Sequence, residues 1–259
     1  MQSFLVHVKG FAARFVAAIR FLTIFPFPGK IGHGRAELGA STPFFPIIGL
    51  LLGGMGSAAC WLLWSVLPPS AAAVLLTTVL LGFSGGLHLD GLADTADGFF
   101  SARPRDTILV IMRDSRIGAM GVLSLVLVLL LKVSALTGLS RSDALKAAFL
   151  MPVAGRCAIL ILMALLPYAR PEGGLGTLFY TRRSRLAGVW AFLFFSFSAL
   201  LLLGNGCWLP ITLFTLTVLG FSLFCKQVIN GATGDTLGAA CELCEACTAL
   251  AIAALVWSA

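Results

Sequence analysis

Residues 117–137 read IGAMGVLSLVLVLLLKVSALT, an apolar run that contains a single charged residue, Lys132. A helix needs about 20 apolar residues to cross the hydrocarbon core of a bilayer, so this run predicts a membrane-spanning helix. Comparable runs lie near 43–67, 70–88, 144–166, 186–204, 207–225 and 236–258. The sequence therefore predicts an all-α fold, a polytopic transmembrane helix bundle with about seven spans.

The composition agrees with a membrane protein. Of the 259 residues, 59% are hydrophobic and only 11% are charged, whereas soluble domains are roughly 45–50% apolar and about 25% charged. So little charge cannot cover the surface of a soluble fold, and lipid must cover part of it. We expect residues 1–259 to form a single integral membrane domain, with the transmembrane bundle in 43–258.

The first 40 residues, 1–40, differ from the rest of the chain. Pro26 and Pro28 end an apolar pattern with interspersed basic residues. No compact apolar region ends in a small-residue cleavage site, which argues against a cleaved signal peptide. The pattern favours an amphipathic interfacial helix in the headgroup layer. Its apolar positions are Phe4, Leu5, Val8, Phe11, Ala12, Phe15, Ile19 and Leu22, and its basic positions are Lys9, Arg14 and Arg20.

The net charge of +7 is distributed unevenly along the chain. If the N-terminus is cytoplasmic, only Arg141 and Lys146 fall in loops on the far side of the membrane. Such an excess of basic residues in cytoplasmic loops predicts a multi-pass protein of the cytoplasmic (inner) membrane. It does not indicate nucleic-acid binding. The basic residues on the cytoplasmic side are Lys9, Arg14, Arg20, Lys30, Arg35, Arg103, Arg105, Arg113, Arg116, Arg170, Arg182, Arg183, Arg185 and Lys226.

Three of the seven cysteines, Cys241, Cys244 and Cys247, form a C-x-x-C-x-x-C run inside the last predicted span. Such a run can indicate iron–sulfur ligation, but no fourth ligand is near it. Small residues spaced three apart lie on one helical stripe, where membrane helices pack closely. We interpret the run as a packing surface.

Five of the 11 acidic residues fall between positions 90 and 114. On a helix that advances about 100° per residue, Asp94 lies about 40° to one side of Asp90 and Asp97 about 20° to the other. The three carboxylates therefore share one narrow stripe beside the membrane. A solvated acidic loop at a helix end is the simpler alternative. Like charges at this spacing repel, and a cation would neutralise them.

The ligand types indicate which cation this would be. Carboxylate oxygens without nearby thiols favour Mg²⁺ or Mn²⁺ over Zn²⁺, and Mg²⁺ usually completes its shell with water and substrate phosphate. His88 lies about 160° around the helix from the stripe, so its role as a metal ligand stays open. We interpret it as a neighbour of the metal site that contributes to substrate binding. The sequence thus predicts Mg²⁺ bound by Asp90, Asp94 and Asp97.

A second segment, IMRDSRIG at 111–118, places Arg113 and Arg116 on either side of Asp114. The guanidinium group presents a planar fork of donors that suits phosphate oxygens. Anchoring of the next span at the membrane interface is the alternative. Their position beside the acidic stripe favours phosphate binding.

A third segment, NGATGDTLGAACE at 230–242, opens the last span. The simpler alternative is that Thr233 or Asp235 is the helix N-cap. However, Glu242 follows Asp235 by seven residues and shares its helix face, and a glycine-rich helix start can bind an anion. Arg156, at apparent membrane depth, is expected to pair with Glu242 or to contact a substrate phosphate, whereas Lys132 only pairs or snorkels.

These segments together resemble the cobalamin synthase family, the adenosylcobinamide-GDP ribazoletransferases. The resemblance rests on GGLHLDGLADTADG at 85–98, IMRDSRIG at 111–118 and TGDTLGAA at 233–240. Shorter matches lie at 20–23, 45–50, 155–156 and 166–170, so the similarity runs nearly end to end.

The resemblance implies a Mg²⁺-dependent enzyme of the last step of cobalamin assembly. It would join adenosylcobinamide-GDP to α-ribazole or its 5′-phosphate and release GMP. Asp90, Asp94 and Asp97 would hold Mg²⁺ against the diphosphate, with Arg113 and Arg116 on its outer oxygens. Asp114 or Asp235, supported by Glu242, would accept the hydroxyl proton. A homo-oligomer, or an association with other enzymes of cobalamin assembly, stays open.

Two other functions are weighed against this one. A CDP-alcohol phosphotransferase has the pattern D-x-x-D-G-x-x-A-R and a later D-x-x-x-D; Asp94, Asp97 and Gly98 match it, but Arg103 comes one residue late and the closing pair is missing. A cation transporter would carry mid-span acidic residues in matching halves of a repeat. We find no such repeat.

Overall fold

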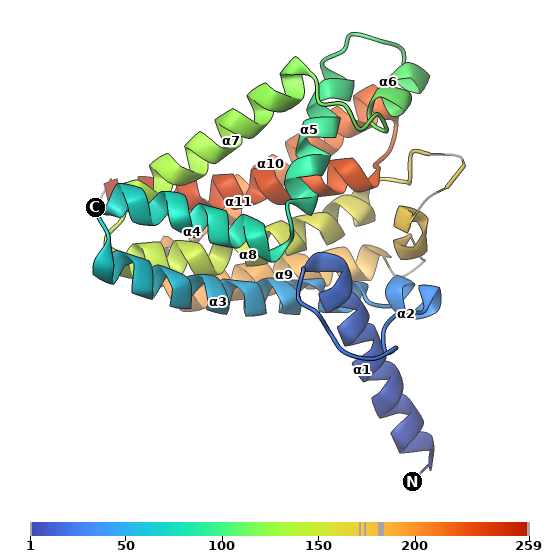
Figure 1. The fold of residues 1–259 in the computed structure, drawn as a ribbon, viewed down its shortest axis with the longest axis horizontal. Helices are drawn as coiled ribbons and strands as arrows, with labels where there is room; N and C mark the ends of the chain where they lie inside the picture. The colour runs from blue at the N-terminus through green and yellow to red at the C-terminus, as the bar shows by residue number, and fades with distance from the viewer. Residues whose placement is uncertain (1, 171, 174, 181–183, 258–259) are drawn as a thin grey trace.

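The computed structural model describes residues 2–170, 172–173, 175–180 and 184–257 (Figure 1). Its regular secondary structure consists of helices, with no β-strand in these ranges. This confirms the predicted all-α class. In chain order the elements are α1 (Gln2–Leu22), α2 (Arg35–Gly39), η1 (Thr42–Phe44), α3 (Phe45–Val66), α4 (Pro69–Phe83), α5 (Leu87–Phe99), α6 (Arg105–Ile111), α7 (Ala119–Thr137), α8 (Arg141–Leu165), η2 (Leu175–Phe179), α9 (Ser184–Leu203), η3 (Gly204–Cys207), α10 (Trp208–Ile229) and α11 (Gly234–Trp257).

The long helices form a bundle around α8. Figure 1 shows α3, α4, α8, α9 and α11 running along one direction, with α7 crossing them obliquely. Of the most apolar stretch of α8, 78% is buried, against 28% for that of α7. α8 therefore forms the core of the bundle, in contact with α3, α9 and α11.

Five segments of the described chain are long and apolar enough to cross a membrane, or six if the bent pair α4–α5 counts as one span. One of the five, 186–229, is 44 residues long and contains both α9 and α10. A multi-pass membrane protein is thus confirmed, but the expected count of about seven spans is not.

Close packing between α3 and α8 depends on small residues. A Cβ atom at Gly53 would lie 2.3 Å from the backbone oxygen of Phe149. Glycine lets two membrane helices approach until their backbones touch, and dispersion forces then favour association. Small residues also lie at a helix contact on α11, where the side chains of Cys241 and Cys244 are buried in the core. The predicted packing role of the cysteine run is therefore confirmed for these two residues.

The predicted span 70–88 ends earlier than expected. α4 stops at Phe83, and the chain turns by 92° into α5. Gly85 and Gly86 make this turn with φ angles of +61° and +76°, a region that glycine adopts without steric cost. The turn directs the whole acidic helix α5 across the end of the bundle.

The N-terminal helix α1 projects from the bundle at the end that also carries α2 and α5 (Figure 1). Its second half packs inward, with Ala17 and Leu22 buried, while Phe11 is exposed. Arg20 donates hydrogen bonds to backbone oxygens of the following loop, including that of Gly29. The amphipathic helix is therefore present, and its position in the headgroup layer stays a prediction.

One end of the bundle carries α5, α6 and the α10–α11 turn, and the C-terminus lies at the other end (Figure 1). Arg105 begins α6 and Lys226 lies in the last turn of α10, both at the first end. Arg141 begins α8 at the opposite end, as the charge distribution predicts. Arg182 and Arg183 lie outside the described residues.

Candidate functional site

Charged side chains from other elements lie near the carboxylates of α5. Asp90 is exposed, and Asp94 is partly buried. Asp94 lies near the carboxylates of Asp90, Asp97 and Asp235, and Arg170 is the nearby cation. We call Asp90, Asp94 and Asp235 the carboxylate cluster. It brings two of the three predicted motifs together at one end of the bundle.

Asp97 has a second role at the start of α7. Its carboxylate accepts hydrogen bonds from the backbone N–H groups of Gly118 at 2.7 Å and Gly121 at 2.8 Å. The first N–H groups of a helix have no partner within the helix, and this side chain supplies one from α5. A Cβ at Gly118 or Gly121 would lie 2.4 Å from an oxygen of Asp97, which explains why both positions are glycine.

Asp235 does not cap α11, because Thr233 takes that role. Thr233 Oγ1 accepts from the backbone N–H of Thr236 at 3.3 Å, and Thr236 Oγ1 accepts from that of Thr233 at 2.8 Å. Asp235 Oδ2 instead accepts from Arg170 Nη2 at 2.6 Å and from the Thr233 hydroxyl at 3.2 Å. Of the two N-cap candidates, Thr233 is the cap.

Arg170 reaches the site from the loop after α8. The segments 167–170 and 230–232 lie side by side and are joined by two backbone hydrogen bonds of 2.8 Å. Arg105 donates to the Ala169 carbonyl oxygen at 2.6 Å and also to the end of α10. These contacts fix Arg170 beside the first turn of α11.

The arginines of the second motif form exposed ion pairs. Arg113 pairs with Glu172, and Arg116 pairs with Asp114. Hydrogen bonds from Arg116 lower the pKa of Asp114 to about 2, so this carboxylate is a weak proton acceptor. Exposed ion pairs contribute little to stability, so either guanidinium group can exchange its partner for a phosphate at little cost.

Glu242 and Arg156 lie deep in the bundle. Lys132 Nζ contacts Glu242 Oε2 and Glu245 Oε2, both at 2.7 Å, and Arg156 Nη1 contacts Glu245 Oε1 at 2.6 Å. All four side chains are buried. We call them the buried ion network. Arg156 therefore pairs with Glu245 and not with Glu242, while Lys132 makes the pairing expected of it.

A cavity of about 180 Å³ lies beside the carboxylate cluster. Asp90 and Asp235 line it, and so does His88, which is only 3% exposed. Asp90 also lines a wider hollow of about 610 Å³ that extends to Ile117 and Leu125 on the side of α7. The exposed carboxylate of Asp90 thus stands between a small cavity and a large one.

The described residues contain no group of three or more His, Cys, Asp or Glu side chains placed to hold one metal ion. The predicted trio Asp90, Asp94 and Asp97 is therefore not arranged as a complete site. Mg²⁺ does not require one, because it usually binds one or two carboxylates and keeps several waters. Asp90 and Asp94, one helical turn apart with Asp235 opposite, fit that incomplete shell.

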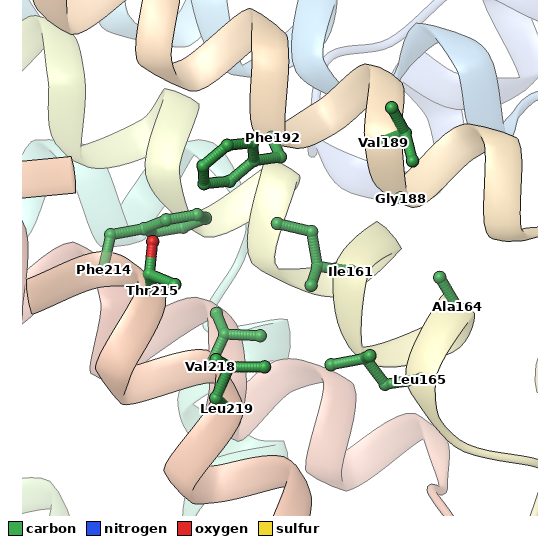
Figure 2. Close-up of a pocket in the computed structure, with 10 residues that line it drawn as sticks. All are labelled: Ile161, Ala164, Leu165, Gly188, Val189, Phe192, Phe214, Thr215, Val218 and Leu219. Atoms are coloured by element: carbon green, nitrogen blue, oxygen red, sulfur yellow. The ribbon is translucent and has the colours of Figure 1, made fainter. Parts of the chain in front are cut away.

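Another hollow, of about 440 Å³, lies between α8, α9 and α10. Figure 2 shows aliphatic and aromatic side chains around it, with the Thr215 hydroxyl as the one polar group drawn. That hydroxyl donates to the Ile211 carbonyl oxygen at 2.7 Å. A groove without charged lining residues cannot bind a diphosphate, so the chemistry belongs at the α5 end.

Two residues at these clusters were not singled out from the sequence. Glu245 follows Glu242 by three positions on the same helix face, and this spacing alone predicts a shared partner. Arg170 closes a segment that carries the family resemblance, but its pairing with Asp235 depends on the loop contacts described above.

The comparisons with known proteins place these features in a family. Residues 14–253 match the family model described as cobalamin-5-phosphate synthase. Three relatives named adenosylcobinamide-GDP ribazoletransferase are 40% identical in Desulforamulus reducens (88% of this chain, 91% of the relative), 38% in Acetivibrio thermocellus (89% and 93%) and 41% in Klebsiella pneumoniae (92% and 98%). No solved structure matches the chain. With a family model over nearly its whole length and relatives of this similarity, the chain belongs to the cobalamin-5-phosphate synthase family.

Proposed function

We propose that this chain joins adenosylcobinamide-GDP to α-ribazole or α-ribazole 5′-phosphate and releases adenosylcobalamin, or its 5′-phosphate, and GMP. The family and the names of the relatives support this reaction. The observation that carries the proposal is the carboxylate cluster, in which three acids at the end of a membrane bundle share one nearby cation, Arg170. Such an excess of negative charge suits a site that binds Mg²⁺ with a diphosphate.

In this proposal Asp90 and Asp94 hold Mg²⁺, and Asp97, the α5 residue whose carboxylate accepts hydrogen bonds from the start of α7, supports them. Each carboxylate oxygen has two acceptor positions, so Asp97 can keep its bonds to α7 while it faces the same ion. When bound, Mg²⁺ supplies charge neutralisation to the diphosphate oxygens.

The arginines at this end of the bundle would bind the remaining phosphate charge. Arg113 and Arg116 are exposed and held only by exposed acids, so they can turn to the diphosphate. Arg170 lies closer to the cluster through Asp235. Arg156 is buried and occupied by Glu245, which supports a role inside the bundle rather than at the phosphate.

The reaction requires one proton to be accepted. The ribose hydroxyl oxygen of α-ribazole attacks the phosphorus bonded to cobinamide, the bond from that phosphorus to the bridging oxygen breaks, and GMP leaves with that oxygen. Asp235 is the acid best placed to take the hydroxyl proton, because it lines the cavity beside Asp90. Asp114, with its lowered pKa, and Glu242, which is buried against Lys132, are less suited.

The direct test is turnover by the purified protein in detergent. With both substrates and Mg²⁺, GMP release and the corrinoid product are followed by chromatography. Asp94→Asn is expected to lower turnover about 10²-fold to 10³-fold, the range for losing one group that stabilises the transition state. Asp106→Asn removes an equal charge from an exposed position on α6 and should turn over normally.

Chelation with EDTA should abolish product formation in the wild-type protein, and added Mg²⁺ should restore it. Product formation that persists without divalent cation would refute the metal role. A folded preparation that forms no cobalamin product with either form of α-ribazole would refute the reaction itself.

We further propose that the α5 end of the bundle faces the cytoplasm, within the inner membrane. The basic residues gathered there support this orientation. Ser115 and Ser142 are exposed at opposite ends, so a membrane-impermeant maleimide applied to spheroplasts should label Ser142→Cys and spare Ser115→Cys. Labelling of Ser115→Cys alone would reverse the topology.

A further inference from the structure

The cavity of about 180 Å³ described above has the composition of a site for an aromatic ring. Most of its wall is apolar and comes from five elements, α1, α5, α8, η2 and α11. Phe21 of α1 and Phe179 of η2 lie on one side with their ring centroids 4.9 Å apart, and Ile159 and Met163 of α8 contribute further wall. Ligand sites of this kind combine apolar walls with a few placed polar groups.

Among the described residues, one buried polar atom at this cavity lacks a partner. His88 Nε2 is fully buried and makes no hydrogen bond there, although the side chain lines the cavity. A buried donor or acceptor without a partner is costly, so native proteins rarely leave one without a reason. Arg156, Glu245 and Lys132 lie near His88, and their charges are matched within the buried ion network. The free atom therefore suits a ligand.

The two substrates of the proposed function contain three ring systems that could be tested against this cavity: guanine, the corrin ring and the base of α-ribazole. Guanine has several donors and acceptors on its edges, and the corrin ring is far larger than a cavity of this volume. The base of α-ribazole is a dimethylated benzimidazole, which is a flat apolar bicycle with one free ring nitrogen that can only accept. A neutral imidazole carrying its proton on Nε2 is the matching donor.

The position of the cavity also suits the reaction. Asp90 and Asp235 line the same cavity as His88. A ribazole with its base in the cavity would present its ribose to these carboxylates, where the proposed phosphoryl transfer takes place. Holding the attacking hydroxyl in this way is the positioning contribution to catalysis.

We propose that this cavity binds the base of α-ribazole and that His88 Nε2–H donates a hydrogen bond to its free ring nitrogen. This inference rests on the proposed function and makes His88 a positioning and specificity residue. It predicts that the enzyme selects bases with an acceptor nitrogen at that place over isosteric bases without one.

A matched pair of ligands tests it in the wild-type protein alone. α-Ribazole is compared with the α-riboside of 5,6-dimethylindole, in which a C–H group replaces the free nitrogen. Binding is measured without adenosylcobinamide-GDP, and turnover is measured with it. We expect α-ribazole to bind about 10-fold to 100-fold more tightly, because the indole leaves the buried donor unpaired. Equal binding of the two would overturn the inference.

Variants of His88 then assign the preference to this side chain. His88→Leu should raise KM for α-ribazole by a similar factor, leave KM for adenosylcobinamide-GDP unchanged and abolish the preference over the indole riboside. His88→Gln, whose amide N–H can replace Nε2–H, should restore part of the preference. A His88→Leu protein that still discriminates between the two ligands would refute the assignment.

Failure here is separable from failure of the proposed function. Cobalamin formation with no discrimination between the ligands would refute only the cavity assignment. Selective, His88-dependent binding of α-ribazole without product would support the cavity and refute the reaction.

Discussion

The buried ion network and the carboxylate cluster use the same kinds of residue in opposite ways. In the network, two cations face two acids, and each acid contacts a cation within 2.7 Å. In the cluster, three acids share one nearby cation and approach the end of the bundle, where Asp90 is exposed. A matched network inside a bundle satisfies its own charges, whereas an unmatched cluster needs a cation from outside.

The two groups of charged residues should therefore affect different properties: the buried ion network affects stability, and the carboxylate cluster affects turnover. Removing one member of the matched network leaves a buried charge unpaired, so the fold should suffer. Removing one member of the unmatched cluster relieves repulsion, so the fold should tolerate it while the reaction is lost. The role of a charged residue within a membrane protein can therefore be inferred only when the number of its oppositely charged partners is known.

The largest expected effect comes from breaking the network. Lys132→Met leaves Glu242 and Glu245 without the cation that they share and should lower the free energy of unfolding by about 3–5 kcal/mol. Denaturation in detergent micelles measures this. The double variant Lys132→Met with Glu242→Gln should recover part of the loss, because one unpaired charge is gone. A single variant as stable as the wild type would contradict the matched-network account.

The next effect concerns the cluster and its cation. Mg²⁺ at about 100 times its Kd should stabilise the wild-type protein by about 2.7 kcal/mol. Asp94→Asn should lose most of this gain while being at least as stable as the wild type in EDTA. Thermal unfolding with and without Mg²⁺ measures both. An unchanged Mg²⁺ response in Asp94→Asn, with Asp106→Asn as the control, would exclude Asp94 as a ligand.

A smaller effect tests the double role of Asp97. Its two oxygens accept from Gly118 and Gly121. An amide in place of the carboxylate keeps only one acceptor oxygen, so Asp97→Asn should lower the free energy of unfolding by about 0.5–2 kcal/mol, the usual range for losing a helix cap. If stability is unchanged and only turnover falls, the bonds to α7 are not what Asp97 contributes.

The smallest effect concerns pH. The folded-state pKa of Asp114 is about 2, below its ordinary value of 3.8. Its pairing with Arg116 therefore favours folding above about pH 4, and this contribution is lost as pH falls towards 2. Because Asp114 does not titrate near neutrality, Asp114→Asn should leave the shape of the turnover profile between about pH 6 and pH 9 unchanged. If Asp114→Asn instead loses the rise or the fall of turnover with pH that the wild type shows, Asp114 would be the proton acceptor.

Long apolar runs predict the helices well, because a bilayer imposes one length on every span. The break after α4 was not predicted. It depends on positive φ angles at Gly85 and Gly86, and a glycine pair in sequence is compatible with a continuing helix as well. The single membrane domain over residues 1–259 stays a prediction.

At the site, the sequence predicts which carboxylates share a helix face but not what each of them contacts. The spacing of Asp90, Asp94 and Asp97 is a property of one helix. The bonds of Asp97 to α7 and the pairing of Arg170 with Asp235 depend on how distant segments pack. Such contacts are set by tertiary structure, which one sequence does not reveal.

The most direct test measures turnover per folded molecule for two variants side by side. Lys132→Met and Asp94→Asn are purified in detergent, their folded fractions are determined, and GMP release is measured at a temperature where both are folded. We predict near wild-type turnover per folded Lys132→Met molecule and a loss of about 10²-fold to 10³-fold for a fully folded Asp94→Asn. The reverse pattern, an active Asp94→Asn and an inactive but folded Lys132→Met, would contradict it.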